Sequence, residues 1–86
     1  MTQLSTVRDS LLGTADTVGK SKAGIVARRS FFYRHGMTAE RFAQQVDAAL
    51  ARAHSPLRVK DFGEKNAYFR GGQTVAQGSH WWAVLG

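Results

Sequence analysis

Residues 25–56 read IVARRSFFYRHGMTAERFAQQVDAALARAHSP, and this stretch decides the fold. Its first ten residues are rich in β-branched and aromatic side chains and fit no helical stripe, which predicts a strand over 25–34. The following residues predict a helix, because Thr38 can cap its first turn and apolar residues then recur at helical spacing. Pro56 ends this helix, since the residue before a proline avoids the helical region. The predicted apolar face of the helix consists of Phe42, Val46, Ala49, Leu50 and Ala53.

The N-terminal side of this stretch predicts a helix and a connector. Apolar residues recur every three or four positions from Leu4 to Val18, which is the period of an amphipathic helix. Gly13 costs such a helix about 1 kcal/mol, so the segment either packs on the rest of the chain or remains a mobile arm. Residues 19–24 contain two glycines and predict a flexible connector. We therefore expect residues 1–24 to precede an α+β core over 25–86, all within a single domain.

The C-terminal side of the stretch predicts further strands. The expected elements are a strand over 57–62, a turn over 63–66, a short returning strand over 67–69, a polar loop over 70–79 and a closing strand over 80–85. The expected fold class is α+β, in the order α-β-α-β-(β)-β, with a three- or four-stranded sheet and the central helix packed on one face. A right-handed crossover would make the first two main strands parallel.

Composition excludes several classes of protein. The 86 residues suffice for one small domain. The chain has no cysteine, which excludes disulfide frameworks, cysteine-based zinc sites and thiol catalysis. It has neither an apolar run of membrane-spanning length nor the layout of a signal peptide, so we expect a cytoplasmic protein without membrane contact. The net charge is +6, and the segment 37–56 contributes none of it. The excess positive charge therefore lies in the predicted strands and connectors.

Strand alternation gathers basic and aromatic side chains on one predicted sheet face. Val26, Arg28 and Phe32 alternate with core residues along the first strand, and Arg58, Lys60 and Phe62 alternate with Leu57 and Val59 along the second. Cations neutralise phosphates and aromatic rings stack on bases, so this pattern favours binding of nucleic acid. The predicted contacts are Arg28, Arg34, Arg58 and Lys60 on phosphates, Phe32 or Trp82 on bases, and Lys20, Lys22 and Arg70 from the loops.

An ordinary solvated face remains the alternative to this interpretation. In that case the N-terminal helix would cover Phe32 and Phe62, and a register error of one residue would also invert the two faces. Trp81 and Trp82 are adjacent and point to opposite faces, so one anchors the core and the other is exposed or lies under another element.

The sequence contains no recognisable catalytic arrangement. The three histidines, His35, His54 and His80, lack carboxylates at ligand spacing, and the acidic residues form no catalytic pair. Ser30 and Ser79 lie in no nucleophile motif, and the glycines around residue 71 match no phosphate-binding fingerprint. We therefore expect a protein that is not an enzyme and that uses no cofactor or metal.

Three segments carry a resemblance to known proteins. They are FFYRHGMTAERF at 31–42, FRGG at 69–72 and SHWW at 79–82. Over residues 25–85 the chain resembles small uncharacterised proteins encoded by bacterial phages and prophages. The resemblance implies an accessory protein that binds nucleic acid or blocks a host machine such as a restriction or CRISPR complex, and it assigns no residue a role.

Three functional hypotheses follow from these observations. The first is a small basic protein that binds single-stranded or duplex nucleic acid through the predicted sheet face. The second is a protein-interaction module that docks on an acidic host protein and inhibits a nucleic-acid machine, with an exposed Trp and the 70–79 loop as hot spots. The third is a homodimer, in which the Leu4-to-Val18 stripe pairs with its twin.

Overall fold

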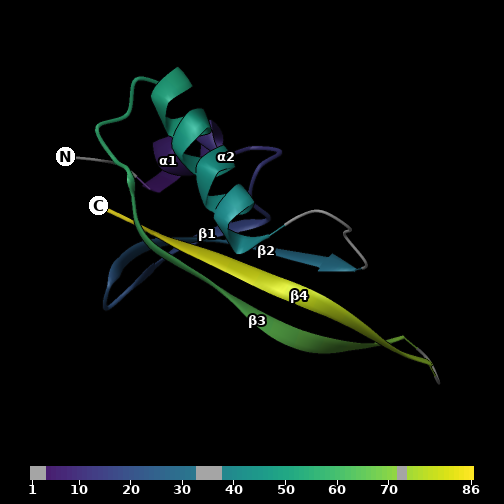
Figure 1. Cartoon of the computed structure of the whole chain (residues 1–86). Helices are drawn as coiled ribbons and strands as arrows, with labels where there is room; N and C mark the ends of the chain where they lie inside the picture. The colour runs from purple at the N-terminus through teal and green to yellow at the C-terminus, as the bar shows by residue number, and fades with distance from the viewer. Residues whose placement is uncertain (1–3, 33–37, 72–73) are drawn as a thin grey trace.

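The computed structural model of the chain describes residues 4–32, 38–71 and 74–86, except for the side chains of 31–32, 66–71 and 74–77. The elements in chain order are α1 (Leu4–Ser10), β1 (Thr17–Ser21), β2 (Gly24–Phe32), α2 (Ala39–Arg52), β3 (Val59–Gly71) and β4 (Thr74–Leu85). They form an α+β fold around a four-stranded sheet, so the predicted fold class is confirmed (Figure 1). The observed order is α-β-β-α-β-β, with one strand, β1, that the sequence did not predict.

Helix α2 forms where the sequence predicts it. Thr38 has extended backbone angles, and its Oγ1 accepts a hydrogen bond of 3.1 Å from the backbone N–H of Arg41. Glu40 lies in the first turn, where a negative charge suits the helix dipole. The predicted apolar face is buried, apart from Ala53, which follows the helix and is exposed. Local capping and a helical stripe therefore agree with the tertiary packing in this element.

Strand β1 replaces the flexible connector that the glycines predicted, so that prediction was wrong. Residues Thr17–Ser21 pair antiparallel with Gly24–Arg28, and only Lys22 and Ala23 lie between the two strands. Gly24 has a φ of +123°, which a residue with a Cβ rarely adopts. Val18 is 7% exposed and belongs to the core, so β1 gains the packing that a free connector would lack.

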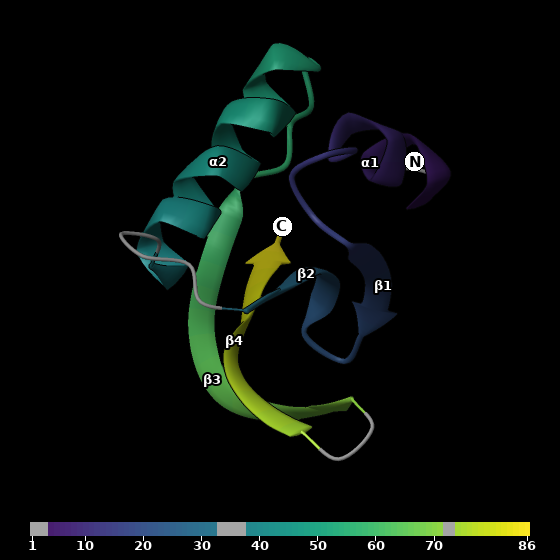
Figure 2. The ribbon, with the colours of Figure 1, turned by 90° about the vertical axis from the view of Figure 1, so that its right-hand side faces the viewer.

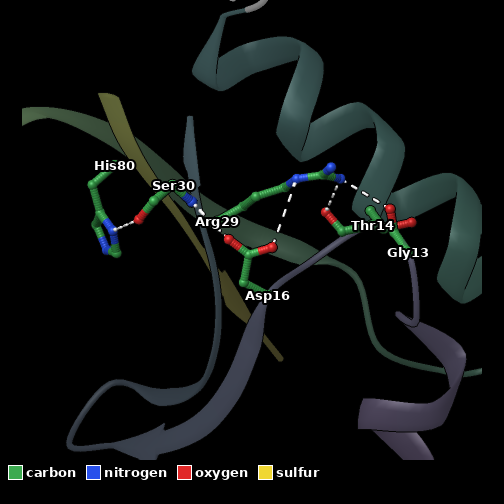
Figure 3. Close-up of polar contacts among 6 residues, drawn as sticks. All are labelled: Gly13, Thr14, Asp16, Arg29, Ser30 and His80. Carbon is green, nitrogen blue, oxygen red and sulfur yellow. Dashed lines mark hydrogen bonds and ion pairs between the residues drawn. The ribbon is translucent and has the colours of Figure 1, made fainter. Parts of the chain in front are cut away.

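Helix α1 is shorter than the predicted amphipathic helix. It ends at Ser10, and Gly13 then takes a φ of +80° that turns the chain out of the helical path. Arg29 of β2 holds this turn, because its Nη1 donates to the carbonyl oxygens of Gly13 and Thr14 at 2.9 and 3.0 Å. Its guanidinium also lies 3.9 Å from the carboxylate of Asp16 (Figure 3). Val18, at the end of the predicted helix, lies in β1 instead.

Strands β3 and β4 form one long hairpin, which corrects two further predictions. The turn predicted over 63–66 lies inside β3, and most of the loop predicted over 70–79 lies inside β4. The pairing runs from Val59 opposite Leu85 to Gly71 opposite Thr74. Because β2 pairs with β4 only from Gly78 to Leu85, the far part of the hairpin extends beyond the rest of the sheet (Figure 1). The molecule is accordingly elongated, with extents of 46 × 24 × 21 Å.

The strand order is β1-β2-β4-β3, and all neighbouring strands are antiparallel. Strands β2 and β3 both run antiparallel to β4, so they point in the same direction, as the crossover through α2 predicts. They are not neighbours, however, because β4 lies between them. The last strand of the chain is therefore central in the sheet.

The hydrophobic core lies between the sheet and both helices, which cover the same sheet face (Figure 2). Trp81 of β4 is 1% exposed and packs against Phe42 of α2, with ring centroids 6.2 Å apart. Val7 and Leu11 pack into the same cluster from α1 and the turn that follows it. The N-terminal segment is therefore part of the core and is not a mobile arm.

The role of Arg29 gives a stability prediction with a control on the neighbouring residue. Arg29→Met removes charged hydrogen bonds to two carbonyl groups, so we expect a loss of about 1–3 kcal/mol in the free energy of unfolding by urea. Arg28→Met changes the same side chain on the exposed face and should alter stability by no more than about 0.5 kcal/mol. Equal losses in the two variants would contradict the structural role of Arg29.

Candidate nucleic-acid interface

One sheet face carries no helix within the described part of the chain, because α1 and α2 both lie on the other side (Figure 2). We call it the open face. Its described residues, assigned from the strand register, are Thr17, Gly19, Val26, Arg28, Ser30, Asp61, Gly63, Lys65, His80, Trp82 and Val84. Helix α1 packs on the same side of the sheet as α2. It therefore does not cover the open face.

Trp82 is the central aromatic side chain of the open face. It is half-buried and lies opposite Arg28 on β2 and Gly63 on β3. A Cβ built on Gly63 would overlap the six-membered ring and Nε1 of the indole, so the ring lies across the backbone of Gly63. Glycine at this position therefore leaves space for an indole that lies along the sheet. The indole is half-buried, so part of it remains accessible to a ligand.

The surroundings of Trp82 are both cationic and apolar. Arg28 is exposed beside it, and Val26 and Val84 are directly opposite one another in the next row of the ladder. Val26 is only 5% exposed although it does not belong to the main core cluster, so its burial comes from the open face itself. Trp82 therefore lies between a guanidinium and a small apolar patch.

A polar row lies on the other side of Trp82. Ser30, His80 and Lys65 are consecutive cross-strand partners on β2, β4 and β3. Ser30 Oγ and His80 Nδ1 are 3.0 Å apart and hydrogen-bonded (Figure 3). The Ser30 and His80 side chains point away from the side of β2 that carries Arg29. The sequence analysis missed these residues as site residues, although alternation backwards from Trp82 places His80 on the same face.

A β-bulge changes the predicted position of Phe62. The register shifts between Val59 and Asp61, so Lys60 is an extra residue and every later side chain of β3 changes face. Phe62 pairs with Ala83 on the helix side, where it is 42% exposed, and not with the open face as predicted. The sequence contains no glycine or proline at the bulge that could have revealed it.

Lys60 lies at a groove that disfavours anions. The groove has a volume of about 250 Å³ between α2 and β3, and Glu40, Asp47 and Asp61 are among its lining residues, together with Phe62. The Lys60 stem also passes close to Gly86, because a Cβ on that glycine would overlap it. Three carboxylates beside one ammonium give this edge of the sheet a negative balance, so Lys60 is a poor phosphate contact.

The other predicted contacts are distributed around the molecule. Arg58 Nη1 donates to the carbonyl oxygens of Ser55 and Leu57 at 2.8 and 2.6 Å, so its side chain bends back onto the chain before β3. Lys20 lies on the helix side of the sheet by register, and Lys22 lies in the β1–β2 turn; both are exposed. Arg34 falls outside the described residues, as do the side chains of Phe32 and Arg70.

The apolar stripe proposed for a homodimer is largely used within the chain. Val7 and Leu11 are 2% and 0% exposed in the core, and Leu4 packs partly against them. Leu12 points away and is 74% exposed. A partner that approached this stripe would therefore meet one leucine, and the Leu4-to-Val18 pattern gives no continuous face for a second copy.

The described residues show no metal centre and no membrane span. No group of three or more metal-ligating carboxylates and histidines occurs among them. None of the described helices has both the length and the apolar character that crossing a membrane requires. No protein-family model, curated protein or solved structure matches the chain.

The contact between Trp82 and Gly63 gives a second prediction. Gly63→Ala places a methyl group inside the indole, which must then leave the sheet surface, and we expect a loss of about 1–3 kcal/mol in stability. Because Trp81 is buried, fluorescence quenching by iodide reports mainly on Trp82, and it should increase in this variant. Gly19→Ala is the control, since a Cβ there meets no atom within 4 Å on the same face. Unchanged quenching in Gly63→Ala would show that the indole lies elsewhere.

Proposed function

We propose that this chain is a small accessory protein that binds single-stranded nucleic acid through its open face. The observation that carries the proposal is the placement of Trp82 along the sheet, with its ring across Gly63 and the exposed Arg28 beside it. A base stacks on the indole, and the guanidinium neutralises an adjacent phosphate. Bases in a duplex are already stacked on each other, so a flat aromatic side chain favours a single strand.

The charge distribution supports the same face. Arg28 and Lys65 are exposed on it, and the only carboxylate assigned to it among the described residues is that of Asp61. Asp61 Oδ1 accepts a hydrogen bond from the backbone N–H of Phe62. The groove beside α2 is acidic instead, and its Glu40 and Asp47 would repel a polyanion. A strand of nucleic acid would therefore follow the open face and avoid the α2 edge.

A second candidate function is binding of an acidic protein on the same face, in the manner of an inhibitor of a host nucleic-acid machine. The specific observation in its favour is that Trp82 and Arg28 lie side by side, with the half-buried Val84 in the next row, because Trp and Arg are frequent hot spots of protein interfaces. A pull-down from a nuclease-treated bacterial lysate separates the two candidates. Specific retention of one protein, lost in Trp82→Leu, would favour the second.

A titration of oligothymidylate against the protein tests the stacking contact. Trp82→Leu should weaken binding by about 5- to 150-fold, which corresponds to the roughly 1–3 kcal/mol of one stacked base. Phe62→Leu is the matched control, because Phe62 is an exposed aromatic residue on the helix side and should leave the affinity unchanged. If the wild-type protein shows no binding tighter than about 10⁻⁴ M at low salt, the proposed function is wrong.

The salt dependence of the same titration tests Arg28. Removal of one phosphate contact lowers the slope of log affinity against log salt concentration by about 0.7 for a single strand. Arg28→Gln should show this change, whereas Arg52→Gln on the helix side should keep the wild-type slope. Identical slopes in all three proteins would remove Arg28 from the interface.

A further inference from the structure

We infer that Ser30, His80 and Lys65 form a phosphate subsite next to the Trp82 base platform. The inference rests on the proposed function and adds a specific contact to it, namely the position of the phosphate that follows the stacked base. None of the three residues was selected by the sequence pattern. Their cross-strand register brings them together on the open face, and the bond of 3.0 Å between Ser30 Oγ and His80 Nδ1 fixes the imidazole.

The Ser30–His80 pair presents a hydrogen-bond donor in every protonation state. If the Ser30 hydroxyl donates to Nδ1, the neutral imidazole carries its proton on Nε2 and donates from there. If Nδ1–H donates to Oγ, the hydroxyl proton of Ser30 is available to a ligand. When the imidazole is protonated, the imidazolium Nε2–H and the hydroxyl can both donate. A ligand that supplies acceptors, as the oxygens of a phosphate do, can therefore bind this pair in each of these states.

Lys65 completes the subsite with a formal positive charge. It is exposed and lies directly opposite His80 on β3, one inter-strand spacing away, or about 5 Å between backbones. The nearest carboxylate on the β2 side is that of Asp16, which accepts from the backbone N–H of Ser30 and faces Arg29 (Figure 3). Arg29 thus offsets the negative charge of Asp16. The net charge beside Ser30, His80 and Lys65 therefore remains positive.

The distance from Trp82 to the subsite suits a phosphate of the same nucleotide whose base stacks on Trp82. His80 and Trp82 are two positions apart along β4, which is about 7 Å in an extended strand. A nucleotide whose base lies on Trp82 places its flanking phosphates at a comparable distance along the sheet. Arg28 lies beside the base platform in the row next to the subsite, so Arg28 and the subsite would contact consecutive phosphates.

The experiment compares two oligothymidylates of equal length, one with natural phosphodiester linkages and one with neutral methylphosphonate linkages. The variant Lys65→Gln should weaken binding of the charged strand and leave binding of the neutral strand unchanged. His80→Gln should weaken binding of the charged strand more than that of the neutral strand, because a methylphosphonate keeps an acceptor oxygen but carries no negative charge. Lys65→Gln should also lower the salt slope of the charged strand by about 0.7, and Lys65→Arg should restore it. Lys60→Gln is the matched control, because it removes the same charge beside the acidic groove and should have no effect.

The outcomes separate the subsite from the proposed function. If Trp82→Leu weakens both strands but Lys65→Gln and His80→Gln behave as wild type, the open face binds nucleic acid and the phosphate subsite is wrong. If Lys60→Gln weakens the charged strand as much as Lys65→Gln does, the effect is general electrostatics, and the subsite is again rejected. If the wild-type protein binds neither strand, both the function and the subsite fail. Urea denaturation of each variant shows whether a loss of binding reflects a loss of fold.

Discussion

The burial of Trp81 determines the direction of every described side chain in the middle of the sheet. This residue lies on the central strand β4 and packs against Phe42 of α2. Because side chains alternate along a strand, His80 and Trp82 must then point to the opposite face. The cross-strand register transmits this choice to β2 and β3, where it places Arg28 and Gly63 beside Trp82. The core contact that stabilises the fold therefore also exposes the residues of the proposed interface.

The same constraint gives two neighbouring arginines different roles. Arg29 pairs with Trp81 and lies on the helix side, where its guanidinium binds the carbonyl groups that follow α1. Arg28 pairs with Trp82 and lies exposed on the open face. The sequence alone could predict that the two point in opposite directions, because alternation requires only that the segment is a strand. The carbonyl partners of Arg29 were not predictable, since α1 and its terminal turn are brought to β2 by tertiary packing.

Local signals predicted the elements whose stability is largely local, and failed where a glycine serves a packing role. The Thr38 cap and the apolar stripe of α2 specify that helix within its own sequence. Gly63 was interpreted as part of a turn, yet it lies inside β3, where it makes space for the indole of Trp82. Two glycines on either side of two lysines likewise suggested a connector at 19–24, but the first part of this segment continues a strand whose Val18 is buried. A distant side chain determined the structure in the first case, and the burial of the strand's own Val18 did so in the second.

The predicted assignment of side chains to one sheet face is correct in part, for a reason that the bulge at Lys60 makes clear. Arg28 and Trp82 lie on strands with regular pairing over residues 25–32 and 78–85, so alternation assigns them to one face without error. Beyond the bulge, alternation counted from Val59 selects the wrong residues, which is why Phe62 was misplaced. Lys65 was overlooked because residues 63–66 were predicted to form a turn, and they lie inside β3. Two carboxylates accept hydrogen bonds from the backbone near this bulge. Asp47 accepts from the N–H of Val59, and Asp61 accepts from the N–H of Phe62. These acidic groups thus satisfy backbone donors at the outer edge of β3, while Arg28 and Lys65 project from the open face. Two exposed cations, Arg28 and Lys65, are therefore available to a ligand on the same face that carries Trp82.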